Sequence, residues 1–151
     1  MLKVLIADDE EKICQLIIKL INWEEMGLKI AATASNGIEA LEQAKICKPE
    51  ILITDIRMPG IDGMELIRKV KEKLPDTEII IISGYRHFEY AQTAIRYGVR
   101  NYLLKPIKKE ELRDTLQKIA DIYREKNEQL NFEERVRLAL KNDAGKLRTS
   151  F

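Results

Sequence analysis

The sequence predicts a doubly wound α/β fold, in which five helices cover both faces of a five-stranded parallel sheet. Short apolar runs typical of strands alternate with segments whose apolar residues recur every three or four positions, as in amphipathic helices. Two runs, 51–54 and 78–82, are almost entirely apolar, which indicates central strands covered on both sides. Because elements that alternate in this way are joined by helical crossovers, the strands should be parallel.

The first third of the chain predicts two strands and two helices. Residues 3–7 and 28–34 are the strands, and the apolar spacing over 13–21 predicts the helix between them. Asn36 can cap the following helix, with Glu39 three residues later as its capping-box partner. The apolar residues expected on the inner face of this second helix are Ile38, Leu41 and Ala44.

The remaining elements continue the alternation. The strand at 51–54 is followed by a turn-rich loop at 58–63 and a helix at 64–70, and the strand at 78–82 comes next. Residues 101–104 are the fifth strand, and a helix follows from Lys108. Phe88, Ala91, Ala94 and Ile95 mark a short helix between the last two strands, and Gly98 is expected to close it. The inward-facing residues of the last helix are expected to be Leu112, Leu116, Ile119 and Tyr123.

Residues after about 129 break the pattern. Asn131 to Glu134 can cap another short helix, and the sequence turns polar from Asn142. We therefore expect one domain over residues 1–128, followed over 129–151 by a linker or the start of a further region.

Composition limits the functional classes. The chain has 151 residues, of which 45% are hydrophobic, enough for one domain core. Its net charge of +1 argues against binding nucleic acid mainly through phosphates. Cys14 and Cys47 lie far apart within apolar helical patterns, which favours two buried thiols in a reducing cytosol. The sequence shows no signal peptide and no apolar run near the ~20 residues that span a bilayer, so we expect a cytoplasmic protein without membrane contact.

Polar side chains stand where four of the predicted strands end. Asp8 and Asp9 follow the first strand, Asp55 follows the third, Ser83 ends the fourth and Lys105 follows the fifth. In a doubly wound sheet, ligands bind beyond the carboxyl ends of the strands. Each residue alone has an ordinary reading as a turn former, a helix cap or a solvated lysine. Their joint placement predicts a functional site.

The residue types indicate phosphoryl chemistry. Three crowded carboxylates need a cation, and Mg²⁺ suits oxygen ligands that share a phosphate. Asp55 stands alone on the central strand and is the best candidate nucleophile, which would form an aspartyl phosphate. Asp8 and Asp9 are better placed to hold the metal. The Lys105 ammonium and the Ser83 hydroxyl would contact the other phosphoryl oxygens.

Four motifs carry a resemblance to a known family: Leu5–Glu10, Thr54–Gly63, Ile82–Gly84 and Tyr102–Pro106. With them, residues 1 to about 125 resemble the receiver domains of bacterial two-component response regulators. The resemblance implies a CheY-like, flavodoxin-like sheet with strand order 2-1-3-4-5.

The resemblance also implies a role for each site residue. Asp55 would be the phosphoacceptor, and Lys105 would pair with a phosphoryl oxygen. Mg²⁺ would be held by Asp8, Asp9 and Asp55, with the backbone carbonyl of Arg57 as a further ligand.

A second group of residues would form the switch. Ser83 would move toward the phosphoryl group, and Tyr102 would turn inward in response. The Lys105–Pro106 bond is expected to be cis. Arg57 and Tyr85 flank the site and are expected to tune the lifetime of the phosphoryl group.

The same resemblance implies a sensor histidine kinase that supplies the phosphoryl group. The near-heptad spacing of apolar residues in the helix at 108–128 favours packing on the sheet, with a homodimer contact as the alternative. Further motifs resemble AraC-type, YesN-like regulators, which carry a helix-turn-helix output domain after the receiver. Residues 130–151 contain no such motif, so DNA binding would belong to a part of the protein absent from this chain.

Two alternatives remain. A phosphatase of the haloacid-dehalogenase kind also uses an aspartyl nucleophile, but it places a second Asp two residues later, where this chain has Arg57. A receiver fold that signals without phosphate would be marked by loss of an acid or of the lysine, and all are present. We therefore expect a switch rather than an enzyme.

Overall fold

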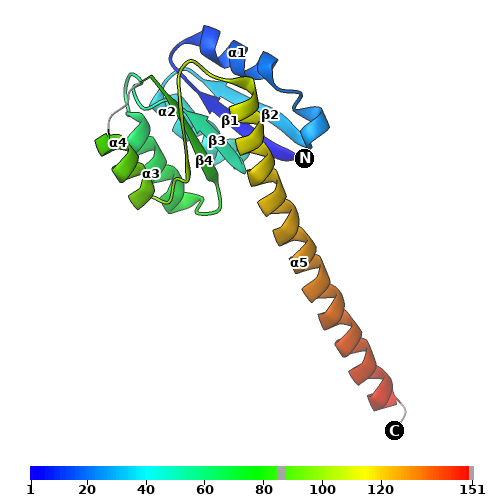
Figure 1. Ribbon diagram of the computed structural model, residues 1–151. Helices are drawn as coiled ribbons and strands as arrows, with labels where there is room; N and C mark the ends of the chain where they lie inside the picture. The colour runs from blue at the N-terminus through cyan, green and yellow to red at the C-terminus, as the bar shows by residue number, and fades with distance from the viewer. Residues whose placement is uncertain (85–87, 150–151) are drawn as a thin grey trace. The chain divides into compact units, whose positions relative to one another are not determined.

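The computed structural model describes residues 1–84 and 88–149, and its five strands form a single parallel sheet (Figure 1). The strands are β1 (Leu2–Ala7), β2 (Leu28–Ala34), β3 (Ile51–Thr54), β4 (Glu78–Ser83) and β5 (Asn101–Leu104). Their order is β2-β1-β3-β4-β5, and every neighbouring pair is parallel. The predicted fold class and strand order are confirmed.

Helices connect the strands and cover both faces of the sheet (Figure 1). They are α1 (Glu11–Leu20), α2 (Gly37–Cys47), α3 (Gly63–Lys73), α4 (Phe88–Arg96) and α5 (Lys109–Thr149). A short 3₁₀ helix, η1 (Glu24–Met26), precedes β2 and was not predicted from the sequence. Helices α2, α3 and α4 lie on one face, and α1 with the start of α5 lies on the other (Figure 1).

The core is built from the central strands. All four residues of β3 and all six of β4 are buried, as their apolar sequences predict. Alternate strand residues such as Leu5, Leu52 and Ile81 pack with Leu66 and Val70 of α3 in one apolar cluster. Because β3 is central in the order, the residue that follows it is held between the ends of β1 and β4.

Two helices begin at side-chain caps. The Asn36 carboxamide oxygen accepts a hydrogen bond of 2.8 Å from the backbone N–H of Glu39, as predicted. The Asp62 carboxylate accepts one of 2.8 Å from the N–H of Glu65 at the start of α3. Asp62, which the sequence places in the turn-rich loop at 58–63, therefore caps α3.

The prediction that Ile38 lies on the inner face of its helix is wrong. Its side chain is 52% exposed. Helix α2 instead buries the small residues Gly37, Ala40 and Ala44. Its backbone lies so close to its neighbours that small side chains fill the inner face, which displaces the larger Ile38 outward.

The C-terminal part of the chain differs from the prediction. No break occurs near residue 129, because α5 is one helix of 41 residues. The chain divides into two compact units, residues 1–117 and 118–151. In the second unit the helix carries exposed apolar side chains, namely Leu130, Phe132, Val136, Leu138 and Leu140.

The helices within residues 1–84 and 88–149 include none that combines the length and apolar character needed to cross a bilayer.

Candidate functional site

The candidate site lies at the carboxyl edge of the sheet, where backbone hydrogen bonds continue the strand ladder past the strand ends. The Asp55 N–H donates to the Ala7 carbonyl at 3.1 Å, and the Asp8 N–H donates to that of Ala34 at 3.0 Å. The Lys105 N–H likewise donates to the Ser83 carbonyl at 2.9 Å. The strand ends therefore fix the backbone of each site residue.

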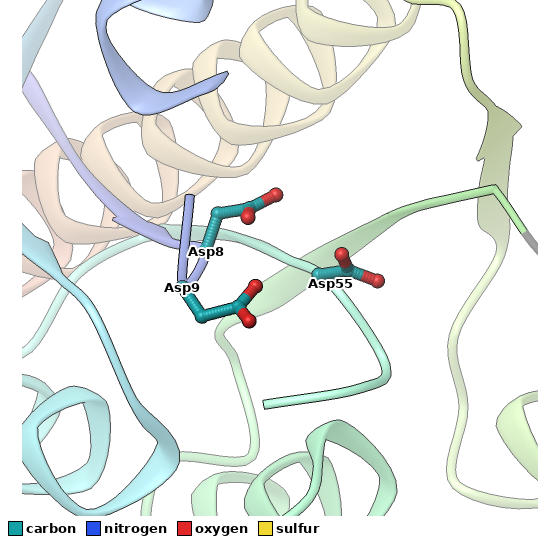
Figure 2. A group of neighbouring side chains, drawn as sticks. All are labelled: Asp8, Asp9 and Asp55. Carbon is teal, nitrogen blue, oxygen red and sulfur yellow. The ribbon is translucent and has the colours of Figure 1, made fainter. Parts of the chain in front are cut away.

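Three carboxylates meet at this edge, as Figure 2 shows. One oxygen from each of Asp8, Asp9 and Asp55 lies within 4.8 Å of the other two. Asp8 and Asp55 are buried, at 2% and 7% exposure, whereas Asp9 is exposed. Such a set of carboxylate oxygens, two in the protein and one facing water, fits a hard divalent cation that keeps part of its hydration shell.

Lys105 links two of the three acids. Its ammonium group lies 2.9 Å from an Asp55 carboxylate oxygen and 3.2 Å from one of Asp8. The second oxygen of each acid accepts a backbone N–H, from Ile56 at 2.6 Å and from Glu10 at 2.9 Å. These bonds hold Asp8 and Asp55 in place while the Asp55 oxygen beside Lys105 faces the cluster.

Burial and charge act in opposite directions on these groups. Burial raises the pKa of Asp8, against the lowering effects of the Glu10 N–H and of Lys105, and the charge of Asp55 raises it further. Burial alone would lower the pKa of Lys105. The hydrogen bond and charge of Asp55, together with Asp8, outweigh burial and raise it, so Lys105 carries its positive charge at neutral pH.

The predicted switch residues lie together. Ser83 is fully buried at the end of β4, and Tyr102 of β5 is half-buried. Their side chains share a hydrogen bond, which lowers the pKa of Tyr102, although burial and the charge of Asp55 raise it overall. Tyr85, the other residue expected near the site, lies outside the described residues. The Lys105–Pro106 bond is cis, as the resemblance implied.

A cavity of about 400 Å³ opens above the acids. Its lining residues are Asp9, Glu10, Asp55, Arg57, Gly84 and Lys105. The sequence-based prediction included five of the six, among them Gly84 as a small residue beside an open phosphoryl site, and omitted Glu10. The Glu10 position could have been found from its place directly after the two acids.

Two glycines hold the loop that follows Asp55. A Cβ atom at Gly63 would collide with the Asp55 backbone carbonyl, and one at Gly37 would collide with that of Ile61. The Gly63 N–H donates to the Ile56 carbonyl at 2.6 Å, so α3 begins in direct contact with the end of β3. The sequence-based prediction missed both roles. The available signal was glycine in the first turn of a helix, where it is otherwise unfavourable.

A parallel 2-1-3-4-5 sheet with acids and a lysine at its carboxyl edge is the architecture of a receiver-type signalling domain. Comparison with known families agrees, because the response regulator receiver domain family matches residues 4–117. The chain therefore belongs to the response regulator receiver family.

Individual relatives support this membership. The chain is 40% identical over 139 residues to YesN, a transcriptional regulatory protein of Bacillus subtilis (strain 168), and the match covers 88% of this chain and 38% of YesN. The receiver domain of AraT, a response regulator from Geobacillus stearothermophilus, superposes with a TM-score of 0.80 at 41% identity, covering 83% of this chain and 98% of that one. The match to YesN thus leaves more than half of that relative's length uncovered.

A further solved structure is a two-component transcriptional regulator AraC from Clostridium phytofermentans ISDg. Its TM-score is 0.74 at 36% identity, with 80% of this chain and 94% of that chain covered. The predicted kinship with AraC-type and YesN-like regulators is confirmed.

Proposed function

We propose that this receiver is a phosphorylation switch that accepts a phosphoryl group on Asp55 from a sensor histidine kinase. The observation that carries the proposal is Lys105, which lies 2.9 Å from Asp55 and 3.2 Å from Asp8 beside a third carboxylate. A purely structural acid would need one partner. Here three clustered acids and one lysine lie beside an open cavity of about 400 Å³, which is large enough to admit a phosphodonor.

In the proposed reaction, an Asp55 carboxylate oxygen attacks the phosphorus of a phosphohistidine. A P–O bond forms, the P–N bond breaks, and its electron pair returns to the imidazole nitrogen. Lys105 keeps its positive charge and neutralises an equatorial phosphoryl oxygen, and the Ser83 hydroxyl donates to another.

Mg²⁺ is the proposed cofactor, held by Asp8, Asp9, Asp55 and the backbone carbonyl of Arg57. When bound, it would neutralise the crowded carboxylates and the charge that develops on the phosphoryl oxygens. The raised pKa of Asp8 supports this assignment, because it reflects a carboxylate whose burial is incompletely compensated by Lys105 and the Glu10 N–H.

The switch itself would begin at Ser83. A phosphoryl group adds roughly two negative charges and three acceptor oxygens at position 55. Turning the Ser83 hydroxyl toward them would break its hydrogen bond with Tyr102 and let the half-buried ring move inward. The surface of α4, β5 and α5 would change with it.

The output is proposed by analogy with the relatives. YesN is a transcriptional regulatory protein, so a region outside this chain would bind DNA, and residues 129–151 would link the receiver to it. We propose a cytoplasmic location and a possible homodimer. Arg57 and Tyr85 would tune the lifetime of the phosphoryl group, which alanine substitution at each, followed by timed dephosphorylation, would test.

The central test is intact-mass measurement after incubation with a small phosphodonor and Mg²⁺. The switch predicts a stable gain of one phosphoryl group, about 80 Da, that requires Mg²⁺ and is absent from Asp55→Asn. Rapid multiple turnover of a phosphoester would support a haloacid-dehalogenase-type phosphatase instead. No adduct in the presence of Mg²⁺ would support an interaction module that works without phosphate.

A further inference from the structure

The second half of α5 carries large apolar side chains that are exposed. Every residue from 124 to 141 is exposed, and among them are Leu130, Phe132, Val136, Leu138 and Leu140, with exposed fractions of 40% to 67%. A helix without tertiary packing is only marginally stable in water, because most helical stability in proteins comes from burial of an apolar face. These side chains therefore indicate a surface that a partner covers.

Three of the five lie on one face of the helix. Phe132, Val136 and Leu140 follow one another at intervals of four residues, slightly more than the roughly 3.6 residues of one helical turn. These three residues are named the α5 apolar face. Leu138 lies two residues from Val136, which places it on roughly the opposite side of the helix. The α5 apolar face is symmetric in sequence, because one large side chain lies four residues from Val136 in each direction.

Charge divides this part of the helix into two segments of opposite sign. Residues 121–134 carry five acidic and two basic side chains, for a net charge of −3. Residues 135–141 carry three basic side chains and no acidic one, for a net charge of +3. The boundary lies next to Val136, the centre of the α5 apolar face. A second copy running in the opposite direction would therefore place its basic segment beside the acidic segment of the first.

We propose that the α5 apolar face binds a second copy of this chain, with the two helices antiparallel and the twofold axis at Val136. The inference rests on the homodimer of the proposed function, to which it adds a surface and an orientation, and it does not require phosphorylation of Asp55. With the axis at this residue, Val136 meets Val136 of the partner subunit, and Phe132 meets the partner's Leu140. The same surface thus serves both copies, as twofold symmetry requires.

The charged side chains beside the α5 apolar face distinguish the two possible directions. Glu133 and Arg137 lie on the same flank of this face, and Glu128 lies on the other. In an antiparallel pair the same flank of each helix meets, so Glu133 of one copy lies near the partner's Arg137, twice in each dimer. In a parallel pair in register, opposite flanks meet, and Glu128 would face Glu133 of the partner subunit. The antiparallel arrangement therefore pairs opposite charges where the parallel one brings like charges together.

Sedimentation equilibrium of the whole chain over a range of concentrations, without phosphodonor or Mg²⁺, tests the surface. The interface has three apolar layers, so we expect a dimer that dissociates on dilution. Val136→Gln changes the axis residue of both copies at once and should raise the dimer Kd about a hundredfold. The matched control is Leu138→Gln, which removes an exposed apolar side chain outside the α5 apolar face and should change the dimer Kd by less than about twofold. Far-UV circular dichroism should show the same helix content in both variants.

Two charge reversals test the direction of the helices. Glu133→Arg and Arg137→Glu each convert both pairs of opposite charge into pairs of like charge, so either variant alone should raise the dimer Kd about tenfold. An equimolar mixture of the two variants should return to within about twofold of wild type, because the mixed dimer again contains two pairs of opposite charge. Contacts within one helix cannot explain this recovery, since each helix keeps its own substitution.

Three results would overturn the inference. A wild-type chain that sediments as a monomer over the whole range would remove the dimer surface. A dimer that Val136→Gln leaves intact, or that Leu138→Gln weakens equally, would mean that the copies meet elsewhere. Tighter association of Glu133→Arg than of wild type would indicate a parallel pair, because the repulsion from Glu128 becomes an attraction. Phosphorylation of Asp55, measured separately by intact mass, decides the proposed switch whichever of these results is found.

Discussion

Acidic residues lie at least partly buried both where the strands begin, at the amino edge of the sheet, and where they end, at its carboxyl edge. Their interactions differ between the two. At the amino edge, the Glu50 carboxylate accepts the backbone N–H of Lys3 at 2.7 Å, and the Glu50 carbonyl accepts that of Glu78 at 2.8 Å. The Glu78 side chain, 7% exposed, pairs with Arg100 at 3.5 Å. Each acid there has a partner of its own and ties one strand to its neighbour.

At the carboxyl edge, three carboxylates gather within 4.8 Å of one another and two of them share Lys105. The contrast teaches that burial of an acid does not by itself indicate function. Competition among several acids for one cation does, because like charges held together destabilise the fold in the absence of a further cation, so such a cluster indicates a ligand or a reaction that requires it. Substitutions at the two edges should therefore have opposite signatures.

The largest expected effect is at the carboxyl edge. Asp55→Asn keeps the shape of the side chain and removes the proposed nucleophile, so phosphorylation should be abolished. Phosphate-affinity electrophoresis or intact mass after incubation with a phosphodonor measures this. An adduct that persists in Asp55→Asn would place the phosphoacceptor elsewhere and remove the distinction between the edges.

Lys105→Met should have the next largest effect. It deletes the ammonium between Asp55 and Asp8, which costs the transition state about 2 kcal/mol, or roughly thirtyfold in rate. Initial rates at saturating Mg²⁺ give the measurement. A rate within twofold of wild type would show that Lys105 only balances charge in the resting domain.

Asp8→Asn tests whether the acids at this edge repel. The folded-state pKa of Asp8 is raised by burial, so the folded state holds the proton more tightly than the unfolded state. Its contribution to stability therefore decreases as pH rises above 3.8 and through the higher folded pKa. Without Mg²⁺, Asp8→Asn should melt a few degrees above wild type at pH 7 and lose this advantage below pH 3.8. A lower melting temperature at pH 7 would contradict the repulsion.

Glu78→Gln at the amino edge should have the smallest effect. Arg100 is 67% exposed, so the ion pair is screened by water and is worth about 0.5 kcal/mol. Urea denaturation should detect this loss, while phosphorylation rates and the thermal stabilisation by Mg²⁺ should match wild type. A slower phosphorylation rate would mean that the two edges are coupled through the sheet.

Much of this contrast could be predicted from the sequence. An acid directly after a fully apolar run marks the end of a central strand, which placed Asp55 correctly, and the same logic placed Asp8 and Lys105. The amino-edge acids could not be separated from ordinary surface residues, since Glu50 and Glu78 are recognisable only from their partners. The apolar periodicity of α2 likewise predicted the wrong position for Ile38. The helix packs close to its neighbours through the small residues Gly37, Ala40 and Ala44, so the larger Ile38 lies outside.

The helix boundary near residue 129 was predicted wrongly for a related reason. Asn131 resembles a helix cap, but a cap residue ends one helix only where the backbone also leaves the helical region. The charged residues around it are compatible with a continuous helix, and α5 runs through. Helix propensity is a weak guide where a helix break and a continuous helix differ little in free energy.

Because Gly63 has no side chain, the loop that follows Asp55 is coupled directly to α3. Since no side chain separates the start of α3 from the Asp55 carbonyl, the two backbones lie in contact. Any displacement of the main chain at residue 55 would therefore displace α3 directly, because no side chain lies between them that could absorb the movement by changing its rotamer. A phosphoryl group on Asp55 would then act on α3 directly, as a second path beside the proposed one through Ser83 and Tyr102.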